Sequence, residues 1–140
     1  MTDARASQPA RRPGLPARDV PSTMSDQDAL ALAHRVVSLA EDKKASDIVL
    51  LGVGALTSLA DYFVICTGGS ERQLGAIADG IEDGLREEGV RPIGREGNAA
   101  THWVLMDYGA VIVHVFAEPE RDYYQLEKLW SDAQTLLHVL

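Results

Sequence analysis

A glycine-rich turn between an apolar run and an expected helix is the first stretch of this sequence whose residue types could do chemistry. The run Tyr62–Cys66 leads into Thr67-Gly68-Gly69-Ser70, and a segment with helical spacing follows. Strand, glycine-rich turn and helix often hold a phosphate, because backbone N–H groups at a helix start bind anions. The two commonest phosphate-binding motifs are absent, since the chain has neither the Gly-Lys-Ser/Thr ending nor the Gly-x-Gly-x-x-Gly spacing here.

A nucleotidyltransferase is a closer match to this turn, because that fold places a Gly-Ser turn at a helix start beside a mixed sheet. Such an enzyme also needs clustered carboxylates to hold metal ions, two of them in an Asp-x-Asp strand. No expected strand carries that pair, and Asp107 is the single carboxylate of its strand. We therefore predict that the glycines only turn the chain and that Ser70 caps the next helix. The alternative is a nucleotide-binding enzyme of nucleotidyltransferase type that uses Gly68-Gly69-Ser70.

The histidines and the cysteine do not combine into a second kind of catalytic or metal site. His102 and Asp107 fall on opposite faces of their expected strand. His114 lies inside the apolar run "VIVHVF", which favours a hydrogen-bonded core histidine, and Cys66 lacks the His/Asn context of a nucleophile. The sequence therefore predicts no catalytic residue, no metal and no cofactor.

Apolar periodicity predicts three helices and five strands that would position these residues. Ser25 or Asp26 can cap the first helix, Gly89 ends the second, and Pro119 opens the third. The order of elements predicts an α/β (α+β) fold in which helices pack on a mixed five-stranded sheet, with the second strand, second helix and third strand forming a crossover. The expected helices are 29–44, 70–88 and 119–137, and the expected strands are 47–53, 62–67, 91–94, 102–107 and 111–116.

Two aromatic residues are candidate anchors for a protein partner. On the expected last helix, Tyr124 lies opposite Leu126 and near Lys128, and an exposed Tyr beside cations is typical of an interface. The alternative is a Tyr that lies flat on its own helix. Trp103 would stand on an open sheet face edged by Glu96 and Asp107, or else be ordinary core.

Composition indicates one domain in a reducing compartment. Of the 140 residues, 46% are hydrophobic, enough for a single core, which we place at residues 25–140. Residues 1–24 are rich in Pro, Arg, Ala and Ser and are predicted to be a disordered extension. The single cysteine, and the lack of a signal peptide or of an apolar stretch of about 18 residues, point to the cytoplasm and to no membrane contact.

The charge of the chain is uneven and limits its partners. The formal net charge is −8, yet residues 1–24 hold four Arg and two Asp, which leaves −10 on residues 25–140. Phosphate backbones repel such a body, so we predict no direct nucleic-acid readout and a preference for a basic partner. The alternative is that the acidity only keeps the domain in solution.

Three long stretches resemble the ribosomal silencing factor family, also called Iojap-related proteins. They are "ADYFVICTGGSERQ", "REGN…HWVLMDYGAVIVHVF" and "ERDYYQLEKLW", and the resemblance runs from about Leu30 to Trp130. It implies a fold like a nucleotidyltransferase without the catalytic carboxylates, and no catalysis.

The resemblance also implies a translation regulator. Family members bind the large ribosomal subunit at its fourteenth protein, block joining of the small subunit and reduce translation when nutrients are short. Some relatives form homodimers, so self-association is a further expectation. The candidate interface residues are Asp61, Glu96, Trp103, Asp107, Tyr124 and Lys128.

Overall fold

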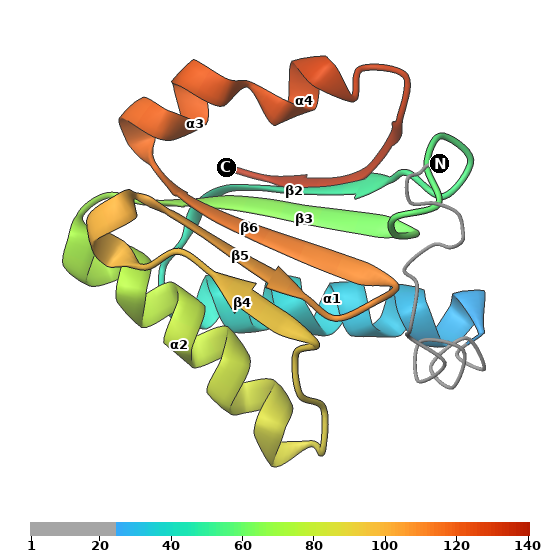
Figure 1. Cartoon of the computed structure of the whole chain (residues 1–140), viewed down its shortest axis with the longest axis horizontal. Helices are drawn as coiled ribbons and strands as arrows, with labels where there is room; N and C mark the ends of the chain where they lie inside the picture. The colour runs from blue at the N-terminus through green and yellow to red at the C-terminus, as the bar shows by residue number, and fades with distance from the viewer. Residues whose placement is uncertain (1–24) are drawn as a thin grey trace.

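A mixed sheet of six strands, with helices on both faces, forms the body of the protein (Figure 1). The computed structural model describes residues 25–140, so the predicted disordered extension at residues 1–24 lies outside the described residues. The strands are arranged in the order β4-β5-β6-β3-β2-β7. They are β2 (Ser46–Gly52), β3 (Tyr62–Gly68), β4 (Gly94–Glu96), β5 (Trp103–Asp107), β6 (Val111–Ala117) and β7 (Gln134–Val139).

The centre of the sheet is the parallel pair of β3 and β6, in register from Tyr62 beside Val111 to Gly68 beside Ala117. All seven residues of β3 are buried, as expected for a strand covered on both faces. The remaining neighbours, β2–β3, β2–β7, β4–β5 and β5–β6, are antiparallel, which confirms the mixed α/β sheet. The predicted crossover differs in one respect, since β6 and β5 lie between β3 and β4.

One face of the sheet is covered by α1 (Asp26–Asp42) and α2 (Glu71–Glu87) (Figure 1). Ser25 and Ser70 cap these helices by accepting backbone N–H bonds, as the sequence predicts. The two helices approach closely, because a Cβ atom added to Gly84 would lie 2.5 Å from Leu39 Cδ2. Gly84 therefore allows close helix packing at this crossing.

The C-terminal part differs from the prediction of one helix over residues 119–137. The chain forms α3 (Glu118–Tyr124) and α4 (Leu126–Leu129), which cross the other face of the sheet, and then the edge strand β7. The helix breaks at Gln125, whose φ of +47° is left-handed. Beyond it, β7 pairs antiparallel with β2 and thereby satisfies backbone groups that would otherwise form a sheet edge. The sheet therefore has six strands and not five.

The glycine turn after β3 brings α2 against the sheet, and this contact can be tested. A Cβ atom at Gly68 would lie 2.8 Å from both the Cα and the N atom of Leu74, which are backbone atoms that cannot easily move. We expect Gly68→Ala to lower the free energy of unfolding by about 2 kcal/mol. Gly94→Ala is the control, because nothing lies within 4 Å of its added Cβ. Equal denaturation midpoints for both variants would contradict this packing role.

Candidate functional site

A layer of aromatic rings covers the sheet face under α3 and α4. Trp103 on β5 lies 4.8 Å from Phe116 and 5.9 Å from His114, measured between ring centroids. Phe63 on β3 continues the layer, with its ring 5.3 Å from His114 and 5.2 Å from Trp130. Edge and tilted contacts at these distances are favourable beyond the area they bury. This layer packs the helical segment 118–130 onto the sheet.

At the edge of this layer the face remains open as a groove of about 350 Å³ beside β4 and β5. Trp103, Leu105 and Asp107 alternate with the buried Val104 and Met106, so they share this half-covered face. The groove is lined by Glu96, Gly97, Thr101, Trp103, Leu105 and Tyr124.

The loop before β5 holds the groove in shape. Asn98 caps the short 3-10 helix Ala99–Thr101, because its Oδ1 accepts the N–H groups of Ala100 and Thr101. Gly97 has a φ of +83°, and an added Cβ would lie 2.0 Å from the carbonyl oxygen of Trp103. Only glycine fits at this position, so the loop backbone lies directly against the start of β5.

The sequence left open whether Trp103 is a core residue or part of an open surface. In the structure it is both, because it packs on the core and also lines the groove. Its ring packs on Phe116 and, at 4.7 Å, on Tyr124, and it remains half-buried. Its indole N–H donates to His114 Nδ1 at 3.2 Å. Burial lowers the pKa of His114 to about 4, so the ring is neutral at physiological pH and its Nδ1 can accept this bond. The predicted hydrogen-bonded core histidine is confirmed.

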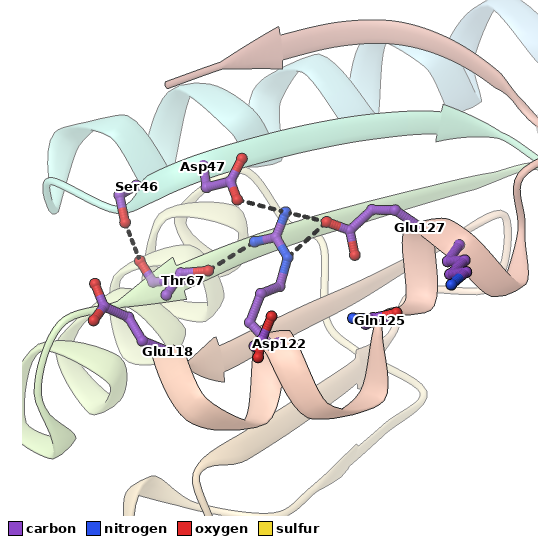
Figure 2. Close-up of a pocket in the computed structure, with 9 residues that line it drawn as sticks. Ser46, Asp47, Thr67, Glu118, Asp122, Gln125 and Glu127 are labelled. Carbon is purple, nitrogen blue, oxygen red and sulfur yellow. Dashed lines mark hydrogen bonds and ion pairs between the residues drawn. The ribbon is translucent and has the colours of Figure 1, made fainter.

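A second hollow, of about 440 Å³, surrounds Arg121 at the other side of α3 (Figure 2). The Arg121 side chain is buried, and its Nη1 donates to Thr67 Oγ1 at 2.7 Å. Its Nε donates to Glu127 Oε2 at 2.8 Å, and Nη2 lies 3.4 Å from Asp47 Oδ2. One guanidinium therefore connects β2, β3, α3 and α4. The helical pattern of the sequence contains no sign that Arg121 is buried.

The structure brings together three of the six candidate interface residues, Glu96, Trp103 and Tyr124, which line one groove. Lys128 is exposed and lines the Arg121 hollow instead. Tyr124 is 46% exposed and packs on Trp103, so it neither stands free nor lies flat on its own helix.

Asp61 and Asp107 lie toward the far end of the strands. Along β6, Trp103 pairs with Phe116 and Asp107 with Ile112, so four residues, roughly 13 Å, separate them. Asp107 Oδ1 accepts the N–H of Gly109 in the hairpin turn. Asp61 follows the 54–60 loop, and desolvation, with a smaller effect of Asp26, raises the pKa of its carboxyl.

The predicted place of His102 within a strand over residues 102–107 is wrong. His102 lies before β5 with a left-handed φ of +65°, not within the strand. Its Nε2 lies 2.8 Å from Glu71 Oε2 and its Nδ1 lies 3.1 Å from Glu120 Oε2. Hydrogen bonds to Glu71 and Glu120 raise the pKa of His102. The ring thus links the starts of α2 and α3, at the opposite end of β5 from Asp107.

The glycine-rich turn uses its own hydrogen-bond donors. The N–H of Gly69 donates to Gln73 Oε1 at 2.6 Å, and the N–H of Gln73 donates to Ser70 Oγ at 3.0 Å. Gln73 Nε2 in turn donates to the carbonyl oxygen of Lys44 at 2.9 Å. Two N–H groups that could face a phosphate are thus occupied by the chain itself, and the turn serves as the predicted helix cap.

The remaining nucleophile in the described part of the chain is the thiol of Cys66, which is buried. Burial raises the pKa of the Cys66 thiol to about 12, so the sulfur is protonated and enclosed. Within residues 25–140, no group of three or more His, Cys, Asp and Glu side chains is placed to hold a metal ion. The same residues include no helix long and apolar enough to cross a membrane.

Comparison with known proteins identifies the family. The model of the family described as "Ribosomal silencing factor during starvation" matches residues 26–139. This chain belongs to that family. The "Ribosomal silencing factor RsfS" of Halalkalibacterium halodurans is 45% identical over 113 residues, 81% of this chain and 94% of that protein.

The silencing-factor fold is also seen in a solved structure. A crystal structure of a Chromobacterium violaceum protein, 40% identical in sequence, has a TM-score of 0.70 and covers 77% of this chain and 88% of that one. A more distant relative is the "Mitochondrial assembly of ribosomal large subunit protein 1" of Mus musculus. It is 31% identical over 127 residues, 89% of this chain and 56% of that protein.

The Arg121 contacts should contribute strongly to stability. Arg121→Met leaves Thr67 Oγ1 and the Glu127 carboxylate without their cation, so we expect the free energy of unfolding to fall by about 3 kcal/mol. Arg35→Met is the matched control, because it breaks an exposed Arg–Glu pair with Glu88 that contributes about 0–1 kcal/mol. Urea denaturation compares the two losses, and equal losses would contradict a clamping role.

The buried His114 should make stability depend on pH. Its pKa is lowered from 6.5 to about 4, so between these values the unfolded chain binds a proton that the folded chain does not. The neutral His114 ring therefore costs the folded state nothing above pH 6.5. As the pH falls toward 4, the free energy of unfolding decreases, by at most about 3 kcal/mol.

His114→Asn removes the titrating group while its amide oxygen can still accept the Trp103 N–H. The difference in free energy of unfolding between wild type and this variant should become smaller as the pH drops. The raised pKa of His102 has the opposite effect on stability, but it is present in both proteins and therefore cancels in this difference. Denaturation curves at about pH 7 and about pH 4.5 measure the gap. A gap that is constant over this range would show that His114 titrates alike in both states.

Proposed function

We propose that this chain binds the large ribosomal subunit through its fourteenth protein, hinders joining of the small subunit and so lowers translation when nutrients are short. The observation that carries the proposal is membership of the silencing-factor family over residues 26–139. The name of the mouse relative, which refers to assembly of the ribosomal large subunit, supports the choice of subunit. We place this action in the cytoplasm, with no cofactor and no catalytic step.

The groove at the β4–β5 edge is the contact surface that we favour. It gathers the exposed Tyr124, the half-buried Trp103 and the exposed carboxylate Glu96 in one place. Aromatic side chains partly fixed by packing lose little freedom on binding, and for this reason they are common at interface centres. Asp107 shares the face of Trp103 and would extend the surface, with Asp61 farther along and Lys128 outside it.

The charge of the domain supports a protein contact over direct nucleic-acid readout. Ribosomal proteins are basic as a class, and an acidic surface attracts them while phosphate backbones repel it. The alternative of a nucleotide-binding enzyme at Gly68-Gly69-Ser70 gains no support from the turn, whose Gly69 N–H and Gln73 N–H bind within the chain.

Co-sedimentation with isolated large subunits tests the proposal. We expect the wild-type chain to travel with large subunits at low salt and to reduce the yield of intact ribosomes when small subunits are added. Trp103→Ala and Tyr124→Ala should each weaken binding by about tenfold or more, as for interface anchors. Tyr123→Ala is the matched control, because Tyr123 is 79% exposed on the same helix and does not line the groove.

Each variant is first checked for an unchanged fold by its unfolding transition. Wild-type protein that stays at the top of the gradient would refute binding to the large subunit. Well-folded Trp103 and Tyr124 variants that bind as tightly as wild type would move the interface away from the groove. Sedimentation of the free chain over a range of concentrations tests the expected self-association.

A further inference from the structure

The groove has an aromatic wall in which the indole N–H of Trp103 is turned inward, toward His114. The rings of Trp103 and Tyr124 lie with centroids 4.7 Å apart and planes inclined by 45°. The Trp103 N–H is already given to His114 Nδ1. Trp103 therefore presents its π-electron surface and carbon edge to a partner side chain, and no hydrogen-bond donor. Such a surface attracts either an apolar group or a cation.

The charge at the groove decides whether an apolar group or a cation is the favoured ligand. Glu96 is the one acidic or basic side chain among the lining residues. It is exposed, and within residues 25–140 it has no ion-pair partner. Its basic neighbour Arg95 cannot neutralise it, because the Arg95 guanidinium is engaged by Glu82 at 2.7 Å and by Asp79 at 3.1 Å on α2. A negative charge at an aromatic wall favours a cation over an apolar group.

We propose that the groove binds an arginine side chain of the partner protein, with the guanidinium stacked on Trp103 or Tyr124 and donating to the Glu96 carboxylate. The proposal rests on the proposed function and adds the chemistry of the contact to it. A guanidinium suits this site better than an ammonium, because it is planar, is weakly hydrated on its faces, and can donate at its edge while it stacks. An apolar side chain or a lysine in the groove are the competing outcomes.

Variants of the groove distinguish binding of a cationic side chain from binding of an apolar one. The measurement is the dissociation constant for isolated large subunits. Glu96→Gln and Tyr124→Leu should each weaken binding by about tenfold, and Tyr124→Phe, which keeps a ring, should lose less than Tyr124→Leu. The controls are Glu87→Gln, an exposed acid on the helix that covers the opposite face of the sheet, and Tyr123→Leu, both expected to stay within about twofold of wild type. Unchanged or tighter binding of Glu96→Gln would overturn the proposal and would favour an apolar side chain in the groove.

A direct probe makes the test independent of the ribosome. The full chain is titrated with the end-blocked peptide Gly-Arg-Gly, and the indole N–H resonance of Trp103 is followed by NMR, assigned with Trp103→Phe. Matched peptides carry citrulline, which has the shape of arginine without its charge, or lysine. A larger shift with arginine than with both supports the proposal. Equal shifts with citrulline or with lysine overturn it.

The two experiments fail in distinguishable ways. If wild-type protein does not bind large subunits, the proposed function falls and the peptide comparison alone decides whether the groove prefers arginine. If it binds them while Glu96→Gln and the peptides show no preference for arginine, the proposed function stands and this inference falls.

Discussion

The position of α3 and α4 on the sheet depends on the contacts of one buried group, the guanidinium of Arg121. A charge that is only 7% exposed is tolerated only when it is paired, and Thr67, Glu127 and Asp47 supply the partners from three other elements. These contacts hold α3 and α4 across the sheet (Figures 1 and 2). Tyr124 lies three residues after Arg121, one helical turn along α3, so the same clamp sets where its ring meets Trp103.

The helical segment covers the sheet incompletely, and the resulting boundary produces the groove. Over β3 and β6 the rings of Phe63 and Phe116 are buried and the half-buried Trp130 packs on Phe63, whereas at β5 the cover stops at Tyr124. Trp103 sits at that boundary and is held from below by His114. A rigid aromatic ring at the edge of a closed core can be offered to a partner without disturbing the core, which is why we favour this edge as the binding surface.

Much of the fold could be predicted because local pattern and tertiary packing agree there. The two N-terminal helices, their serine caps and the four longer strands before residue 118 lie within about three residues of their expected positions. The largest error came at the C-terminus, where Leu126, Trp130, Ala133 and Leu137 have helical spacing. The three first named pack on the aromatic face, and Leu137 packs on the opposite core from β7. Two short helices and a strand can present the same apolar residues as one helix, so periodicity cannot distinguish them.

The sequence by itself determined the family, the acidic character of the domain, the cap at Ser70 and the buried environment of His114, because each is carried by local residue types. Only the tertiary structure decided which candidate interface residues meet. Glu96, Trp103 and Tyr124 come from three elements and converge in one groove, while Lys128, four residues after Tyr124, faces the Arg121 hollow. The reason is Gln125, whose left-handed backbone turns the chain between α3 and α4. A change of direction at one residue redirects every side chain after it, and a helical pattern contains no sign of it.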